Sequence, residues 1–290
     1  MSAMEGGSPE AGGPADTARA RAGRAGRRAA QEVANAERHE RRFAETGREF
    51  HSTMAARHRA VAERHLTTAR LQHAYALRLA EAASDDSEDS GVPPLFMAGV
   101  AEACGTRSAA LTLLGADLSQ LAVAASDQPS RGAQDLEYVL TAGPGRDAAR
   151  HRRAVYASGA TLERRWPGYG AGLAALGLHA VAALPLNASS DCIGVLTIFD
   201  PAAALARSGR FREVAAALAD GVLIGPDADP GLYGGTDLRA VVHQASGVLS
   251  EQSGSSVDDA LALIKARSFA LGVPLETVAR RVISGDLKLR

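Results

Sequence analysis

The chain has 290 residues, 46% of them hydrophobic and only 4% aromatic, and its formal net charge is −1 at pH 7. This length suits about two compact domains with additional segments. A chain so near neutrality has no global field that attracts nucleic acid or an anionic membrane, so such binding requires a local cluster of charge. The two cysteines, Cys104 and Cys192, lie far apart, which excludes a disulfide framework and fits a reducing compartment. With no membrane-spanning apolar run and no recognisable signal peptide, we expect a cytoplasmic protein without a membrane partner.

The N-terminal part of the sequence predicts a disordered tail followed by a long helix. Residues 1–15 are rich in glycine and proline, whereas residues 16–83 contain no proline and consist mainly of good helix formers, with a break near Gly47. Four apolar residues follow at spacings of 7, 4 and 7 positions, as in a coiled-coil core, and favour a homodimer. These are Phe43, Phe50, Met54 and Val61.

The same segment is rich in arginine, with 13 arginines against 7 acidic residues between Asp16 and His73. A solvated helix surface is one interpretation, and contact with nucleic-acid phosphates is the other. His51, His58 and His65 are spaced by seven, which does not match the ligand spacing of a metal site, so we predict no metal ligand. The sequence also lacks a phosphate-binding glycine loop, a paired Cys-x-x-Cys and a nucleophile elbow. It therefore predicts no catalytic residue and no enzyme, and it names no cofactor.

Residues 84–225 have the pattern of an α+β domain built on a mainly antiparallel sheet, with a first helix that could begin near residue 71. Short apolar runs separated by glycine, aspartate and proline are flanked by helical patterns. The runs that predict strands are 109–114, 121–125, 154–156, 180–186 and 193–199. Residues 226–235 are rich in glycine, proline and aspartate and predict a linker.

Residues 236–290 predict three short amphipathic helices that share one small core. Apolar residues recur at helical spacing in three successive stripes. The stripes are Leu238, Val241, Val242, Ala245, Val248 and Leu249; then Val257, Ala260, Leu261, Ile264 and Leu271; then Leu275, Val278, Ala279, Val282 and Ile283. Ser256 and Asp259 form a shortened capping box for the second helix, Gly272 ends it, and Pro274 suits the first turn of the third.

The order of residues in these stripes resembles the ANTAR domain, and the resemblance extends from about Thr236 to Leu287. The matching positions include Ala245, Gly247, Val248, Leu249, Ser256, Asp259, Ala260, Leu263, Ile264, Leu275, Val278, Ala279 and Val282. Ser246 and Ser250 depart from the family pattern, which has a basic residue and a methionine there. The resemblance implies binding to RNA hairpins in nascent transcripts and relief of transcription termination.

RNA recognition needs cations for phosphates and groups that can approach bases, and the C-terminal segment supplies both. The candidate RNA-binding residues are Gln244, Ser246, Gly247, Lys265, Arg267, Arg280 and Arg281. For Gly247 an equally weighted interpretation is that it allows two helices to pack closely.

A second resemblance, to GAF sensor domains, covers about Leu71 to Ile224. It rests on the runs Leu136–Tyr138, Gly143–Ala148, Arg165–Pro167 and Leu184–Leu186. Gly145 stands where relatives have a cysteine. The resemblance implies a sensor pocket between the sheet and the helices that cover one face, and leaves open whether it holds a small-molecule ligand. Tyr138, Trp166 and Tyr169 could line that pocket, with ordinary core packing as the alternative.

The sequence therefore predicts a signal-responsive, RNA-binding transcription antitermination regulator, with a long N-terminal helix, a GAF-like sensor and an ANTAR-like bundle. The alternative is a non-enzymatic sensor or scaffold whose bundle contacts proteins without binding RNA.

Overall fold

The computed structural model describes residues 13–84, 95–188, 191–202, 209–223, 238–271 and 273–289. These residues belong to two compact units, residues 1–90 and residues 91–290, and each unit is considered by itself. The linker predicted at 226–235, the helix stop at Gly272 and most of the predicted N-terminal tail lie outside the described residues.

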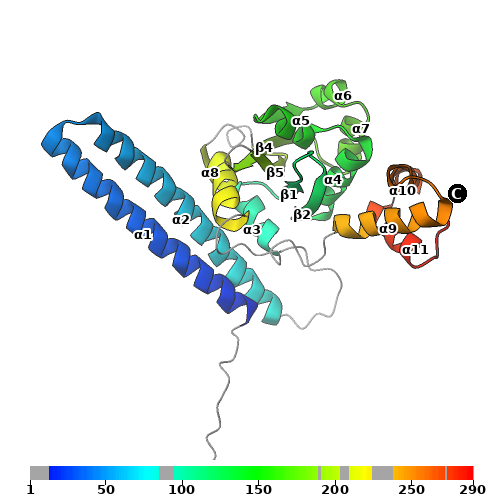
Figure 1. Cartoon of the computed structure of the whole chain (residues 1–290), viewed down its shortest axis with the longest axis horizontal. Helices are drawn as coiled ribbons and strands as arrows, with labels where there is room; N and C mark the ends of the chain where they lie inside the picture. Colours follow the sequence, from blue (N-terminus) through cyan, green and yellow to red (C-terminus); the bar gives the residue numbers. More distant parts are fainter. Residues whose placement is uncertain are drawn as a thin grey trace, which may run out of the picture. The chain divides into compact units, whose positions relative to one another are not determined.

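The first unit is a helical hairpin of α1 (Pro14–Thr46) and α2 (Glu49–Ser84), which pack along each other (Figure 1). Helix α1 begins at Pro14, within the predicted tail, because proline is well accommodated in a first helical turn. Gly47 has a left-handed φ of 64° and its N–H donates to the carbonyl of Phe43, which ends α1. The predicted break near Gly47 is thus confirmed.

The seam of the hairpin is formed on α1 by alanines rather than by the larger apolar residues that the spacing suggested, whereas α2 also buries Thr67, Thr68, Leu71 and Gln72. In α1 the buried alanines are spaced by 7, 4 and 7 positions, namely Ala18, Ala25, Ala29 and Ala36, and α2 contributes Ala55 and Ala62. Phe43 and Phe50 are 40% and 64% exposed, so they do not form the core of the hairpin, and their place in a coiled-coil core between two copies of the chain stays a prediction. Both lie next to the turn, where little of the opposite helix remains to cover them, while small alanines let the helices approach closely elsewhere.

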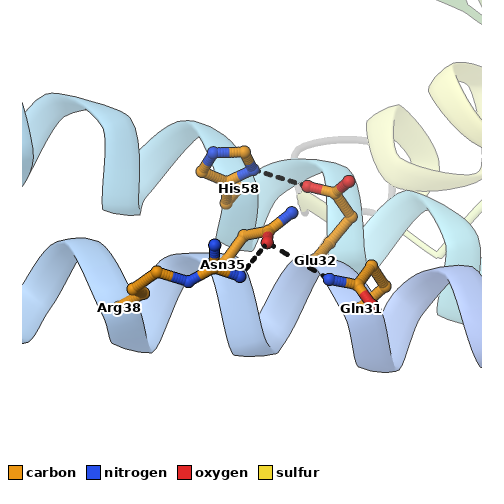
Figure 2. Close-up of polar contacts among 5 residues, drawn as sticks. All are labelled: Gln31, Glu32, Asn35, Arg38 and His58. Atoms are coloured by element: carbon orange, nitrogen blue, oxygen red, sulfur yellow. Dashed lines mark hydrogen bonds and ion pairs between the residues drawn. The ribbon is translucent and has the colours of Figure 1, made fainter.

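Polar contacts along the hairpin add links within and between the two helices. The His58 ring nitrogen Nδ1 lies 2.6 Å from Glu32 Oε2, and this contact joins α2 to α1 (Figure 2). On α1, Asn35 Oδ1 accepts hydrogen bonds from Gln31 and Arg38 (Figure 2). Such polar links contribute little stability individually, but the His58–Glu32 contact between the helices favours one alignment of the hairpin.

The second unit contains a five-stranded sheet in which every pairing is antiparallel, in the order β2-β1-β5-β4-β3. The strands are β1 (Ser108–Leu114), β2 (Gln120–Ala125), β3 (Val155–Ser158), β4 (Ala180–Ala188) and β5 (Asp191–Phe199). Each corresponds to one of the predicted apolar runs, so the predicted α+β class and the antiparallel sheet are confirmed.

Helices cover this sheet on both faces (Figure 1). Helices α4 (Gln128–Leu140) and α5 (Pro144–His151) pack on one face, together with the short α6 (Ala160–Arg165) and α7 (Tyr169–Ala175). Helices α3 (Leu95–Ala103) and α8 (Gly209–Ala217), and a π-helical turn over Leu218–Leu223, contact the sheet from the other side. Successive side chains of a strand point to opposite faces of a sheet. Because helices cover both faces here, nearly all residues of β1 and β5 are buried.

The C-terminal bundle consists of α9 (Leu238–Ser253), α10 (Val257–Leu271) and α11 (Leu275–Ile283). Its buried residues are Val242, Ala245, Leu249, Ala260, Ile264, Leu275, Val278, Ala279 and Val282, which confirms the shared core. Three predicted core residues are instead exposed, Val257, Leu271 and Ile283, because each lies at a helix end.

The predicted cap of α10 is confirmed. The Ser256 hydroxyl oxygen accepts the N–H of Asp259 at 3.1 Å and donates to the Asp259 carboxylate at 2.7 Å. Pro274 immediately precedes α11, one position earlier than predicted.

Candidate functional site

The exposed face of α9 contains a glycine that helix packing does not require. Gln244 and Gly247 are exposed, and a Cβ atom added at Gly247 would meet no heavy atom within 4 Å. Glycine in a helix interior costs about 0.5–1 kcal/mol relative to alanine. Because no neighbouring helix occupies the space beside it, the packing interpretation of Gly247 does not hold. What remains is a position where the backbone of a partner can approach closely.

The two serines that depart from the ANTAR pattern have structural roles. Ser246 is completely buried and its hydroxyl donates to the carbonyl of His243 at 2.8 Å. Its expected contact with RNA does not agree with this burial, because the side chain faces the interior of the bundle. The Ser250 hydroxyl donates to the carbonyl of Ser255 at 2.7 Å and so holds the turn between α9 and α10.

The basic residues of the bundle do not converge on one face. Lys265 and Arg267 are two positions apart on α10, roughly 200° around the helix, so they point in different directions. Arg280 pairs with Glu276 at 2.6 Å on α11. Within the described part of the chain, the exposed Arg267 and Arg281 form no ion pair.

Lys265 and Glu276 instead contact helix α4 of the sheet domain. The Lys265 Nζ atom lies 4.0 Å from the ring centroid of Tyr138, a cation–π distance, and Glu276 lies 4.0 Å from Arg131. Tyr138 is only 5% exposed because it belongs to the apolar core of the bundle. A cavity of about 510 Å³ lies at the same contact, lined mainly by α4 and by residues around the α10–α11 connection. Tyr138, which was expected to line a sensor pocket, therefore joins the sheet domain to the bundle.

A second, smaller cavity lies between the sheet and helices α4 and α5, and its centre is Glu137. This side chain is 1% exposed, and one of its carboxylate oxygens accepts the backbone N–H of Arg146. A Cβ atom at Gly143 would lie 2.6 Å from the Glu137 carboxyl carbon, and one at Gly145 would lie 3.0 Å from its Oε1 atom. The two glycines thus make room for the carboxylate at the start of α5. Burial raises the pKa of Glu137 to about 7, although the N–H groups of Arg146 and Gly145 oppose this shift.

The motif residues that carried the GAF resemblance come together around α5. The Asp147 carboxylate accepts hydrogen bonds from the Trp166 indole at 3.2 Å and from Arg165 at 3.1 Å, and the Arg165 guanidinium lies 4.7 Å from the indole centroid. Trp166 and Tyr169 are buried in the core beside the cavity and are not among the residues that line it. Their arrangement agrees with the packing interpretation.

Sequence reasoning missed the polar side of α4. Ser130, Gln134 and Glu137 are all buried, and they recur at i, i+4 and i+7 on the helix face that meets the sheet. The Thr112 hydroxyl on β1 donates to Gln134 Oε1 at 2.7 Å. Ser130 belongs to the capping box of α4, whereas Gln134 and Glu137 line the small cavity. Two polar residues at helical spacing, in a helix that follows two strands, were the available signal for this site.

Two kinds of feature are absent from the residues that the structure describes. These residues contain no group of three or more His, Cys, Asp or Glu side chains arranged to hold a metal ion. No helix among them combines the length and apolar character needed to cross a membrane.

The molecule thus combines an α+β domain, which has a buried carboxylate beside its sheet, with a three-helix bundle that has an open glycine face. Residues 236–283 match the family model of the ANTAR domain. This match covers the bundle and does not reach the sheet domain. Comparison with curated proteins gave no match to the chain, and comparison with solved structures gave none either. ANTAR domains occur in RNA-binding antitermination regulators, a class that is typically non-enzymatic, and the match assigns this domain type to residues 236–283.

Proposed function

We propose that the chain is a signal-responsive antitermination regulator, in which the bundle binds hairpins in nascent transcripts and the sheet domain is a GAF-like sensor. The observation that carries this proposal is the ANTAR match over the whole bundle, residues 236–283. The open face of α9 supports it, because a backbone position without a Cβ atom lets a nucleotide approach more closely than any side chain would.

The proposed RNA-contacting set consists of the exposed candidates that no described ion pair engages, namely Gln244 and Gly247 on α9 with Arg267 on α10 and Arg281 on α11. Exposed arginines without carboxylate partners can neutralise phosphates, and an exposed amide can read a base edge. Lys265 and Arg280 are engaged with Tyr138 and Glu276, so they join this set only when those contacts open.

Helix α4 supplies a route from signal to output. Its neighbouring residues Glu137 and Tyr138 contact the small cavity and the bundle, respectively. A ligand that moves α4 at Glu137 therefore also changes the contact between Tyr138 and Lys265. Release of Lys265 would add a cation to the RNA-binding surface.

We further propose a homodimer, in which two bundles bind two hairpins and gain affinity through effective concentration. The alanines of the seam are already buried between α1 and α2 of one chain. The dimer contact would therefore use other residues, such as the exposed Phe43 and Phe50. Sedimentation equilibrium of the full chain and of a Phe43→Ser/Phe50→Ser variant tests this. A wild-type monomer at micromolar concentration contradicts the dimer.

The test of RNA binding is crosslinking of the purified chain to cellular RNA, followed by sequencing and affinity measurement on the enriched hairpins. An Arg267→Ala/Arg281→Ala variant should bind more weakly, and the slope of log K against log salt should fall by about 0.7–0.9 for each phosphate that the variant no longer neutralises. Arg212→Ala, at an exposed position of α8, is the matched control and should leave both unchanged. If no hairpin class is enriched, the proposal fails. If binding depends instead on residues 16–83, the arginine-rich hairpin is the RNA-binding element.

The second candidate is a scaffold whose bundle contacts proteins and has lost RNA binding. It is favoured by the burial of Ser246 and by the engagement of Lys265 and Arg280. It predicts that RNA affinity is weak and does not respond to the Arg267/Arg281 substitution. A direct binding curve on structured RNA separates the two functions.

A further inference from the structure

The small cavity beside the sheet contains buried acceptor oxygens that nothing in the described part of the chain satisfies. Glu137 Oε2 on α4 and Gln120 Oε1 on β2 have no hydrogen-bond partner, and their side chains are 1% and 3% exposed. Both residues line the cavity. Buried polar atoms are rarely left unpaired in native proteins, so two of them in one cavity point to a bound hydrogen-bond donor.

The charges at the more exposed end of the cavity are mixed. Arg146 is half-buried, Arg150 is exposed, and both line the cavity. Asp117, which also lines it, accepts hydrogen bonds from the backbone and hydroxyl of Ser119, and these lower its pKa and keep it ionised. A ligand that enters therefore meets acceptors at the buried end, and two guanidinium groups together with the Asp117 carboxylate nearer the solvent.

The size of the cavity limits the ligand. Its volume is about 70 Å³. Since one water needs roughly 10–15 Å³ on this measure, the space suits a molecule of about five to seven non-hydrogen atoms. A nucleotide, a haem or a bilin is much larger than this space.

We propose that the cavity binds a small zwitterionic amino acid of the size of glycine or alanine. Its ammonium group donates to Glu137 Oε2 and Gln120 Oε1, and its carboxylate faces Arg146 and Arg150. An ammonium group has three donors and no acceptor, which matches two unpaired oxygens, and arginine is well suited to a carboxylate. This inference rests on the proposed function, because the amino acid would be the signal of the GAF-like domain.

The pH dependence of binding follows from the groups that surround the site. Glu137 has a pKa of about 7, so below that pH it must lose a proton before it can pair with an ammonium group. Among its neighbours, the hydrogen bonds from Ser119 lower the pKa of Asp117 and burial raises the pKa of Tyr169 well above its usual value, so neither group changes its charge between pH 6 and 8. The guanidinium groups of Arg146 and Arg150 line the same cavity. Asp147 also raises the pKa of Glu137. Affinity should therefore fall about tenfold per pH unit below 7.

Isothermal titration calorimetry of the full chain tests the proposal with glycine, L-alanine, L-valine, methylammonium and acetate as probes. Glycine or alanine should bind best, methylammonium and acetate more weakly, and valine should be excluded by its size. Glu137→Gln should reduce the affinity about 10- to 100-fold and abolish its pH dependence. Glu213→Gln, an exposed carboxylate on α8, is the matched control and should change neither.

Arg150→Ala provides a variant that cannot disturb the core, because Arg150 is exposed. It should weaken glycine binding and leave methylammonium binding unchanged. The inference is overturned if no amino acid binds at millimolar concentration, or if Glu137→Gln binds as well as the wild type. RNA binding without amino-acid binding refutes this inference alone, whereas amino-acid binding without RNA binding refutes the proposed function alone.

Discussion

Replacing Gly247 with alanine should change stability and RNA binding in opposite directions. Gly247 lies in the interior of α9, has no positive φ, and has no heavy atom within 4 Å of the position that a Cβ would occupy. The new methyl group therefore meets no obstacle, and the helix gains about 0.5–1 kcal/mol through its higher intrinsic propensity. In a cooperative unit the size of residues 91–290, this raises Tm by about 2 °C, which calorimetry can detect.

The effect on RNA comes from the same methyl group. If a nucleotide packs against the bare backbone at Gly247, the Cβ atom displaces it, and a loss of about 1 kcal/mol lowers the affinity about fivefold. Fluorescence anisotropy with an enriched hairpin measures this loss. Gly26→Ala in α1 is the matched control, because its Cβ also meets no atom within 4 Å; it should add helix propensity without changing RNA affinity. An unchanged affinity for Gly247→Ala, together with the raised Tm, would refute an RNA contact at this position.

Three further substitutions test the fold and the buried carboxylate. Ser256→Ala removes the cap of α10 and should cost about 1 kcal/mol in urea unfolding; no loss would mean that the cap does not stabilise α10. Glu137 has its pKa raised from 4.5 to about 7, so its contribution to stability is fully present below pH 4.5 and is lost as the pH rises through 7, by about 3 kcal/mol in all. Glu137→Gln should remove that part of the pH dependence, and identical urea midpoint profiles for both proteins between pH 5 and 8 would contradict the assignment. Ala29→Leu should destabilise the hairpin by about 1–3 kcal/mol in thermal circular dichroism, and a stabilised variant would show that the seam has room for larger residues.

The helices and strands of this protein could be predicted where a repeating sequence pattern has one physical explanation, such as burial of one face of a helix. The five strands followed from short apolar runs between turn residues, and the bundle core followed from stripes at Ala245, Ile264 and Val278. The cap at Ser256 was predictable because its partner, Asp259, lies only three residues away. The break at Gly47 was predictable because the left-handed conformation favours glycine.

The cavity at Glu137 could not be predicted in the same way, because it is formed by residues that are far apart in the sequence. Nothing in the sequence near Glu137 shows that the glycines at 143 and 145 leave space for its carboxylate, or that Gln120 on strand β2 lines the same cavity. Ser246 was expected to contact RNA because its hydroxyl is polar. The side chain is instead buried, and the hydroxyl donates a hydrogen bond to a carbonyl of its own helix. In the N-terminal hairpin the large residues Phe43 and Phe50 matched a core spacing, yet the alanines occupy the shared face.

The alanine seam of the hairpin has a consequence for how the chain can associate. Methyl groups spaced by seven and four residues along α1 are nearly equivalent, so the seam by itself distinguishes poorly between one alignment of two helices and another. The alignment within one chain is fixed by the turn at Gly47 and by links such as Glu32–His58 and Glu40–Arg59. If that turn straightened, α1 and α2 would form one continuous helix, and each seam could be covered by the helix of a second copy, as in a domain swap. The turn at Gly47, together with these ion pairs, thus keeps the methyl groups buried within one chain rather than between two.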